Sequence, residues 1–251
     1  MLKMPGSPSR TRMALYGAGA VLAVALAGFA LIYFVLFPTS SPAPFKLSTA
    51  TTASKSTESP TSTASATGVS GSLAGTWTIG TGSQAGYRVR EKLAFLPAQS
   101  DAVGRTSQIT GTASFAQAGS SVAITAATFN VNVLTLKSDR EMRDEKIKEI
   151  GLESARYPTA TFALSAPVTL PAKILSGSLV KVPVTGVFNI HGVSKRETIP
   201  VEMSAAGGTV QAVGSLTFPW GEFGMTAPSV GGFVNVTEHA TMEFDLHLAR
   251  S

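Results

Sequence analysis

Runs in which every second side chain is apolar recur between residue 73 and the C-terminus, and this alternation constrains the fold more than any other feature. The clearest run ends the chain, where one face carries Val234, Val236, Ala240, Met242, Phe244, Leu246 and Leu248. The other face of the same run carries Asn235, His239, Glu243, Asp245 and His247. A period of two is typical of β-strands with one buried face, so the sequence predicts an all-β fold.

The number and length of these runs favour a closed barrel. About eight of them lie within residues 73–251, with turn signals such as Gly207–Gly208 and Gly231–Gly232 between them. Many strands with one apolar face each form either a barrel or a sandwich, and long strands favour the barrel. The interior of an eight-stranded barrel is just large enough for side chains or for one small ligand.

One strand changes its phase partway along. Val122 and Ile124 lie on one face, whereas Phe129 and Val131 follow in the opposite phase. A slip by one residue is the signature of a β-bulge, which we expect near Ala127.

A single helix is predicted within Lys137–Arg156, where twelve of twenty residues carry charge. Ser138 and Glu141 have the spacing of a capping box, and Gly151 can supply the left-handed residue that ends a helix. The apolar stripe is narrow and consists of Met142, Ile147 and Ile150. Such a stripe suffices to pack on a sheet, so we expect this helix to cap the barrel.

The N-terminal part predicts a membrane anchor. Met13–Phe37 is 25 residues long and uncharged, and a helix of that length exceeds the roughly 30 Å hydrocarbon core. The basic residues of the flank 1–12 all precede it: Lys3, Arg10 and Arg12. The positive-inside rule then places the N-terminus in the cytoplasm and the rest outside a single-pass cell-membrane anchor. The alternative is a cleaved signal peptide, whose apolar core is normally about 7–15 residues.

Composition divides the remaining chain into a tether and a folded domain. Residues 38–72 are rich in Ser, Thr, Ala and Pro, bury too little apolar surface to fold, and predict a disordered tether. Residues 73–251 form the predicted domain and carry 15 basic and 14 acidic side chains. A nearly neutral domain argues against a nucleic-acid partner.

The sequence contains few residues arranged for metal binding or catalysis. His239, Glu243 and His247 lie four residues apart, which on a strand is about 13 Å, too far to share one ion. The chain contains no G-x-S-x-G, H-E-x-x-H or glycine-rich phosphate loop. Glu91 falls on an apolar face, where it acts as an inward acid or base on a lipid, pairs with an arginine, or lies at the rim of the barrel. We therefore expect no metal and no enzymatic activity.

Several short motifs occur in order: Thr76–Ile79, Arg140 with Arg143–Asp144, Arg156–Phe162, Val187–Lys195 and Gly221–Met225. In this order and spacing, across Gly75–Leu248, they resemble the YceI-like family of lipid- and polyisoprenoid-binding, lipocalin-like domains. The resemblance implies an extended eight-stranded antiparallel barrel, a capping helix and a long apolar tunnel for an isoprenoid or similar lipid. Members are usually extracytoplasmic, which agrees with the predicted topology.

The resulting hypothesis is an extracytoplasmic carrier that sequesters an isoprenoid lipid or quinone without any other cofactor. Residues chosen by size and alternation as the ligand-binding lining are Phe115, Phe129, Phe162, Phe188, Trp220, Phe223, Met225 and Phe244. The alternative is a structural or interaction module whose barrel is filled by its own side chains. Cavity volume distinguishes the two.

Overall fold

The computed structural model describes residues 41–47, 72–93, 99–230 and 234–251. The strands are β1 (Gly75–Ile79), β2 (Gln84–Leu93), β3 (Gln99–Thr106), β4 (Ile109–Ala118), β5 (Ser121–Asn132), β6 (Thr159–Leu164), β7 (Val168–Leu170), β8 (Val180–Ile190), β9 (Val193–Ala206), β10 (Thr209–Pro219), β11 (Ser229–Val230) and β12 (Val234–Arg250). The helices are α2 (Glu141–Glu149) and the 3-10 helices η1 (Val133–Thr135), η2 (Ala172–Ser176) and η3 (Trp220–Phe223).

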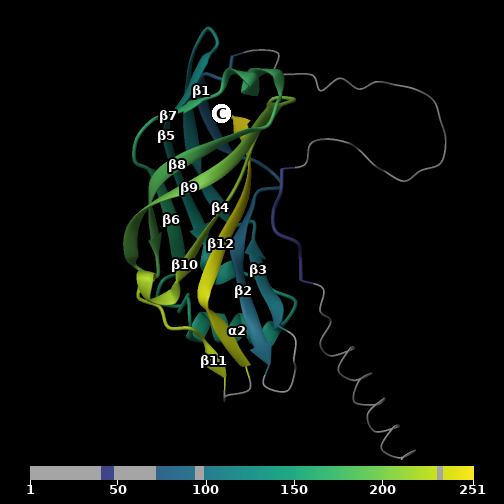
Figure 1. The fold of residues 1–251 in the computed structure, drawn as a ribbon, viewed down its shortest axis with the longest axis vertical. Coiled ribbons are helices and arrows are strands. Elements are labelled where there is room, and N and C mark those ends of the chain that lie inside the picture. The colour runs from purple at the N-terminus through teal and green to yellow at the C-terminus, as the bar shows by residue number, and fades with distance from the viewer. Residues whose placement is uncertain (1–40, 48–71, 94–98, 231–233) are drawn as a thin grey trace, which may run out of the picture. The chain divides into compact units, whose positions relative to one another are not determined.

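Eight strands form a closed antiparallel barrel (Figure 1). Their order is β1-β4-β5-β6-β8-β9-β10-β12, and the ring closes because β1 also pairs with the end of β12. At this seam Trp77 lies opposite Arg250, and Ile79 lies opposite Leu248. The structure confirms the predicted all-β, eight-stranded antiparallel barrel with one α-helix.

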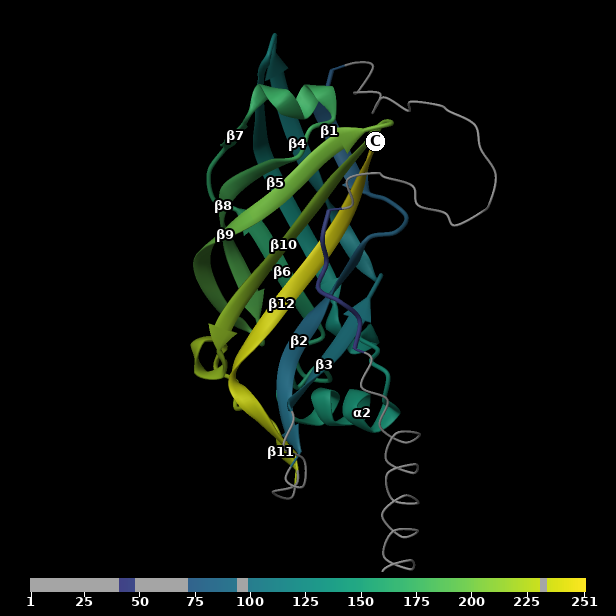
Figure 2. The same ribbon diagram turned by 45° about the vertical axis from the view of Figure 1, so that its right-hand side comes forward.

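The two ends of the barrel are built differently (Figures 1 and 2). Strand β12 is 17 residues long, and only its last residues pair with β1. Its earlier part pairs with β2, which in turn pairs with β3, so these strands continue the wall toward α2. We call this end, where α2 lies, the α2 end, and the other the C-terminal end.

The predicted alternation determines which side chains face inward. Strand β8 shows it most regularly, because Val180, Val182, Val184, Phe188 and Ile190 are all buried. The predicted bulge is also present: Ser114 pairs with Ala126 and Phe115 with Ile124, which leaves Thr125 without a partner residue on β4. The bulge therefore lies two residues before the predicted position, at Ala127.

Helix α2 is shorter than predicted, and its N-terminus differs. Arg140 is the N-cap residue, so the expected capping box between Ser138 and Glu141 does not form. Instead Asp144 accepts hydrogen bonds from the backbone N–H and the hydroxyl of Ser138, at 2.8 and 2.7 Å. The carboxylate of Asp144 in the first turn thus provides the hydrogen-bond acceptor for the residues that lead into the helix. At the other end Gly151 follows the helix with the expected positive φ of 85°.

Part of the predicted tether lies against the barrel. Residues 41–47 run beside β2 and β3 (Figure 2), while residues 48–71 and Met13–Phe37 lie outside the described residues. Within the described ranges, none of the helices has the length and hydropathy needed to cross a bilayer.

Candidate ligand-binding site

The barrel encloses a cavity of about 100 Å³. Its walls come from the inward faces of β2, β4, β5, β6, β8, β9, β10 and β12. Apart from Thr161, the described residues that line it are apolar. It includes five of the predicted lining residues: Phe115, Phe129, Phe162, Phe188 and Phe244.

A second cavity of about 70 Å³ lies at the α2 end. Ile147 of α2 lines it, together with Trp220 and Met225 from the predicted set. The indole N–H of Trp220 donates to the carbonyl of Thr237 at 2.8 Å, so the polar atom of this ring is satisfied outside the cavity lining. The two cavities adjoin, because both are lined by Ala85, Val131, Ala160 and Met242.

Phe223 is the one predicted lining residue that the structure does not bring to either cavity. It lies in η3, is fully buried, and makes an edge-to-face contact with Phe218 at 4.7 Å between ring centroids. Its apolar character reflects packing of the loop after β10.

Three glycines on the strands leave room for aromatic rings of the cavity lining to lie against the backbone. A Cβ on Gly214 would lie 2.5 Å from the ring of Phe244, and one on Gly186 would lie 2.0 Å from the ring of Phe162. A Cβ on Gly111 would lie 2.1 Å from the carbonyl oxygen of Thr128 and 2.8 Å from the ring of Phe129, so backbone and ring together exclude it. Each ring thus occupies space above a neighbouring strand that any other residue would fill. This arrangement keeps three phenylalanines close to the wall of the barrel.

The aromatic lining is continuous across three adjacent strands. Phe129 of β5 stacks on Phe162 of β6 with an interplanar angle of 15°, at 6.3 Å between centroids. Phe162 in turn contacts Phe188 of β8 at 4.9 Å. These contacts build one hydrocarbon surface inside the first cavity.

Glu91 pairs with an arginine, which is one of the interpretations that the sequence left open. Its carboxylate accepts two hydrogen bonds from Arg143 of α2, at 3.1 and 3.0 Å. Both side chains are largely buried, with 13% and 12% exposure. Burial disfavours the charged guanidinium, but hydrogen bonds and the charges of Glu91 and Asp139 outweigh it and raise the pKa of Arg143. This ion pair fastens α2 to β2.

Tyr87 is a buried polar residue next to that pair. Its side chain lines the second cavity, and its ring lies over Gly104 of β3. In the part of the chain that the structure describes, its hydroxyl has no hydrogen-bond partner. Burial raises the pKa of Tyr87, against the lowering effect of the Arg143 charge.

Comparison with known proteins identifies the family. The YceI-like domain family matches residues 77–248, which covers the whole barrel from β1 into β12. The chain belongs to the YceI-like family. The resemblance seen in the sequence is therefore confirmed, and the barrel and helix are those of a YceI-like domain.

Comparison with solved structures finds similar chains of low sequence identity. A polyisoprenoid-binding domain from Saccharophagus degradans, implicated in plant cell wall breakdown, is 14% identical with a TM-score of 0.51, covering 70% of this chain and 98% of that one. BcnA from Burkholderia cenocepacia is 20% identical with a TM-score of 0.47, covering 65% of this chain and 95% of that one. None of the curated proteins compared matches the chain.

Proposed function

We propose that this YceI-like protein is a membrane-anchored, extracytoplasmic binding protein that holds an isoprenoid lipid or quinone inside its barrel, without catalysis. The observation that carries the proposal is the pair of adjoining cavities with apolar walls. A branched hydrocarbon chain offers no hydrogen-bonding group along its length, and the first cavity offers almost none in return. The similarity to a polyisoprenoid-binding domain supports the same class of ligand.

The binding energy in such a site comes from removing the chain from water. Each buried methylene contributes about 0.8 kcal/mol, so a few isoprene units suffice for firm binding. Because this contribution is not directional, the lining needs the right width and no polar partners. The phenylalanines seated on glycines provide such walls.

The volumes determine how the ligand must be accommodated. An apolar cavity of about 150 Å³ accepts one benzene, so the first cavity, at about 100 Å³, is too small for a long chain as it stands. We expect the residues between the cavities to move, above all Met242, because methionine is unbranched and flexible. Joined cavities would extend from the first cavity to the α2 end.

The sequence supports the location of the protein. Met13–Phe37 is long and uncharged enough to span a bilayer, and the basic residues precede it. With the N-terminus in the cytoplasm, the barrel lies outside the cell membrane. The anchor keeps the barrel near the bilayer in which isoprenoid lipids and quinones dissolve.

The second candidate is a structural or interaction module with a filled barrel, and the small cavity volumes favour it. It predicts an interior that takes up no lipid and a partner bound on an outer face. The two candidates therefore differ in a property that can be measured directly.

The test is to purify the full chain from membranes, extract it with organic solvent and identify the lipids by mass spectrometry. We expect one isoprenoid or quinone per barrel, or uptake of added polyprenol or quinone when the purified protein has lost it. Absence of lipid together with absence of uptake contradicts the proposal and supports the filled barrel.

A matched pair of variants assigns the lipid to the interior. Ala160 lines both cavities, so Ala160→Leu fills the space between them and should abolish most of the bound lipid. Ala163 lies on the exposed face of the same strand, so Ala163→Leu should leave the lipid content unchanged. Equal lipid content in the two variants contradicts binding inside the barrel.

A further inference from the structure

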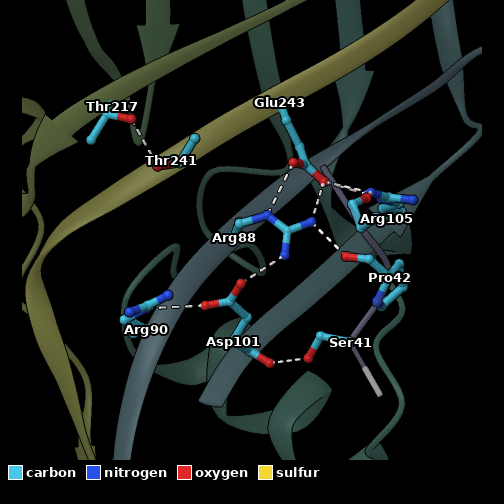
Figure 3. Close-up of polar contacts among 10 residues, drawn as sticks. Ser41, Pro42, Arg88, Arg90, Asp101, Arg105, Thr217, Thr241 and Glu243 are labelled. Carbon is cyan, nitrogen blue, oxygen red and sulfur yellow. Dashed lines mark hydrogen bonds and ion pairs between the residues drawn. The ribbon is translucent and has the colours of Figure 1, made fainter. Parts of the chain in front are cut away.

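Residues 41–47, which we call the docked segment, are held on the outer face of the barrel by two arginines (Figure 3). Arg88 of β2 donates a hydrogen bond to the carbonyl of Pro42 at 2.7 Å. Arg105 of β3 donates to the carbonyl of Ala43 at 2.6 Å. Both bonds go to the backbone of the segment, and both donors are charged, which makes them strong.

Side chains of the docked segment add further contacts. The guanidinium of Arg105 lies over the ring of Phe45, 3.8 Å from its centroid. The side chain of Leu47 is 9% exposed. A segment with these contacts is seated on the barrel along its length.

The arginines are fixed by the barrel itself. Glu243 of β12 is 3% exposed, and its carboxylate accepts hydrogen bonds from Arg105 at 2.8 Å and from Arg88 at 3.3 Å. Arg88 also pairs with Asp101 at 3.1 Å, and Figure 3 shows it lying between both acids and the carbonyl of Pro42. Because β2, β3 and β12 already orient these donors, the segment meets a preorganised surface.

The docked segment has a direction. The hydroxyl of Ser41 donates to the carbonyl of Asp101. Glu91 of β2 is bonded to α2 and so marks the α2 end. In the β2–β3 register Asp101 lies opposite Arg90, the neighbour of Glu91, whereas Arg105 lies opposite Gly86, farther from α2. The chain therefore enters at the side of the α2 end and runs toward the C-terminal end.

Chain length links this direction to the bilayer. Only residues 38–40 separate Ser41 from the apolar stretch Met13–Phe37. Four fully extended steps reach at most about 14 Å. If that stretch spans the membrane, Ser41 lies within this distance of the bilayer surface, and the α2 end is the nearer end of the barrel.

Exposed apolar side chains gather at the same end. Within the described ranges, the large hydrophobic residues that are exposed are Leu134 of η1 and Met142 and Ile150 of the α2 region, at 38%, 77% and 37%. These side chains offer apolar surface on the side from which the docked segment enters, and the short chain to the apolar stretch makes a lipid surface the occupant.

We propose that the docked segment holds the barrel with its α2 end against the outer surface of the bilayer, so that the second cavity lies on the membrane side. This orientation rests on the proposed membrane anchor and on no assumption about which lipid is bound. It gives a ligand the shortest route between bilayer and barrel, past α2.

The orientation can be measured with single cysteines, because the chain has none of its own. Met142→Cys places a fluorophore at the α2 end, and Ser120→Cys places one in the exposed β4–β5 turn at the other end. Strand β4 has ten residues, which is about 33 Å along the strand. In phosphatidylcholine vesicles with a head-group spin label, we expect strong quenching at 142 and little at 120. Equal quenching, stronger quenching at 120, or a chain that does not sediment with the vesicles contradicts the proposal.

Two insertions test the role of the docked segment. A flexible Gly/Ser linker of twenty residues, which adds about 25 Å of reach, is inserted either between Ser40 and Ser41 or between Ser56 and Thr57. We expect the first insertion to lower quenching at 142 to the level at 120, and the second to leave it unchanged. Equal effects of the two insertions, including no effect of either, contradict a docked segment that sets the distance.

The lipid content of the same samples reports the proposed function separately. An oriented barrel without bound lipid would leave this inference standing and overturn the function, whereas bound lipid in an unoriented barrel would do the reverse.

Discussion

The two sides of β12 differ in burial and in what holds them: Met242 and Phe244 on the inner side are partly buried, whereas Glu243 on the outer side is buried. Met242 and Phe244 point into the barrel and line its cavity, whereas Glu243 between them lies on the outer face with two arginines. The stability of the inner side depends on how well apolar side chains fill the available volume, without hydrogen bonds or ion pairs. The outer side depends on a charge that is 3% exposed and fully paired. We conclude that the inner wall should accept changes of size at modest cost, while the outer wall should not accept loss of charge.

The largest effect is expected for Glu243→Gln. Removing the carboxylate leaves Arg88 and Arg105 without their shared partner in a buried site, which costs about 3–5 kcal/mol of unfolding free energy. Urea denaturation followed by the fluorescence of Trp77 and Trp220 measures it. Glu238→Gln, at an exposed position of the same strand, is the control and should change stability by less than about 0.5 kcal/mol. If the two variants are equally stable, the outer network does not stabilise the barrel as described.

A smaller effect is expected for Gly214→Ala on the inner wall. The added Cβ would lie 2.5 Å from the ring of Phe244, so the ring must turn toward the centre of the barrel. Overpacking of this kind costs about 1–3 kcal/mol, and the displaced ring should also reduce the lipid content. Gly221→Ala is the control, because a Cβ there meets no atom within 4 Å. Unchanged stability and unchanged lipid content in Gly214→Ala would show that the position of the Phe244 ring does not depend on a glycine at 214.

Tyr87→Phe should act in the opposite direction. At pH 7 the loss of a buried hydroxyl without a partner should stabilise the protein by about 1 kcal/mol. Burial raises the pKa of Tyr87 in the folded state, so the stability linked to this proton is fully present below about pH 10 and is lost as the pH rises above it. Urea denaturation at pH 7 and in the alkaline range should show a smaller alkaline loss for the variant. An equal alkaline loss in both proteins would contradict the burial of this group.

The smallest effect is expected for Lys181→Ala. Lys181 and Glu202 form an ion pair at 3.4 Å, but their side chains are 61% and 37% exposed. An exposed pair contributes about 0–1 kcal/mol, so this variant should differ from the wild type by no more than a few tenths. Comparison with Glu243→Gln tests whether burial, and not the presence of a pair, sets the cost. Similar losses in both would break the contrast between the two sites.

The barrel could be predicted because alternation is a local property of the sequence. The phase slip in β5 and the inward set on β8 followed from it, as did the five predicted lining phenylalanines that lie on strands and line the first cavity. Trp220, Phe223 and Met225 belong to the segment after β10, where a period of two no longer defines a face; Trp220 and Met225 line the second cavity and Phe223 lines neither. Whether these residues bind a ligand stays a prediction.

The glycines that lie against the aromatic rings could not be predicted without knowing the register of the paired strands. A glycine within a strand normally signals weakness or a bulge, and only the pairing of Gly214 with Phe244 shows which ring it receives. A glycine expected opposite an inward phenylalanine is the signal that would have identified it. Gly186 and Phe162 show the limit of that signal, because they lie diagonally across β6 and β8.

The docked segment was hidden for a related reason. It begins with small residues and prolines, like the rest of the predicted tether, and Phe45 and Leu47 are too few to predict a folded segment. The groups that hold it, Arg88, Arg105 and Glu243, lie far away in the sequence and meet only when β2, β3 and β12 pair. Local composition reports the intrinsic tendency of a segment and contains no information about such distant partners.

The most direct test of the central claim is a crystal structure of the protein purified from its own membranes. The account predicts continuous electron density of one methyl-branched hydrocarbon chain inside the barrel, running from the first cavity past Ala160 and Met242 to the α2 end. Side chains closed around two separate small cavities, with no density between them after incubation with polyprenol or quinone, would contradict it.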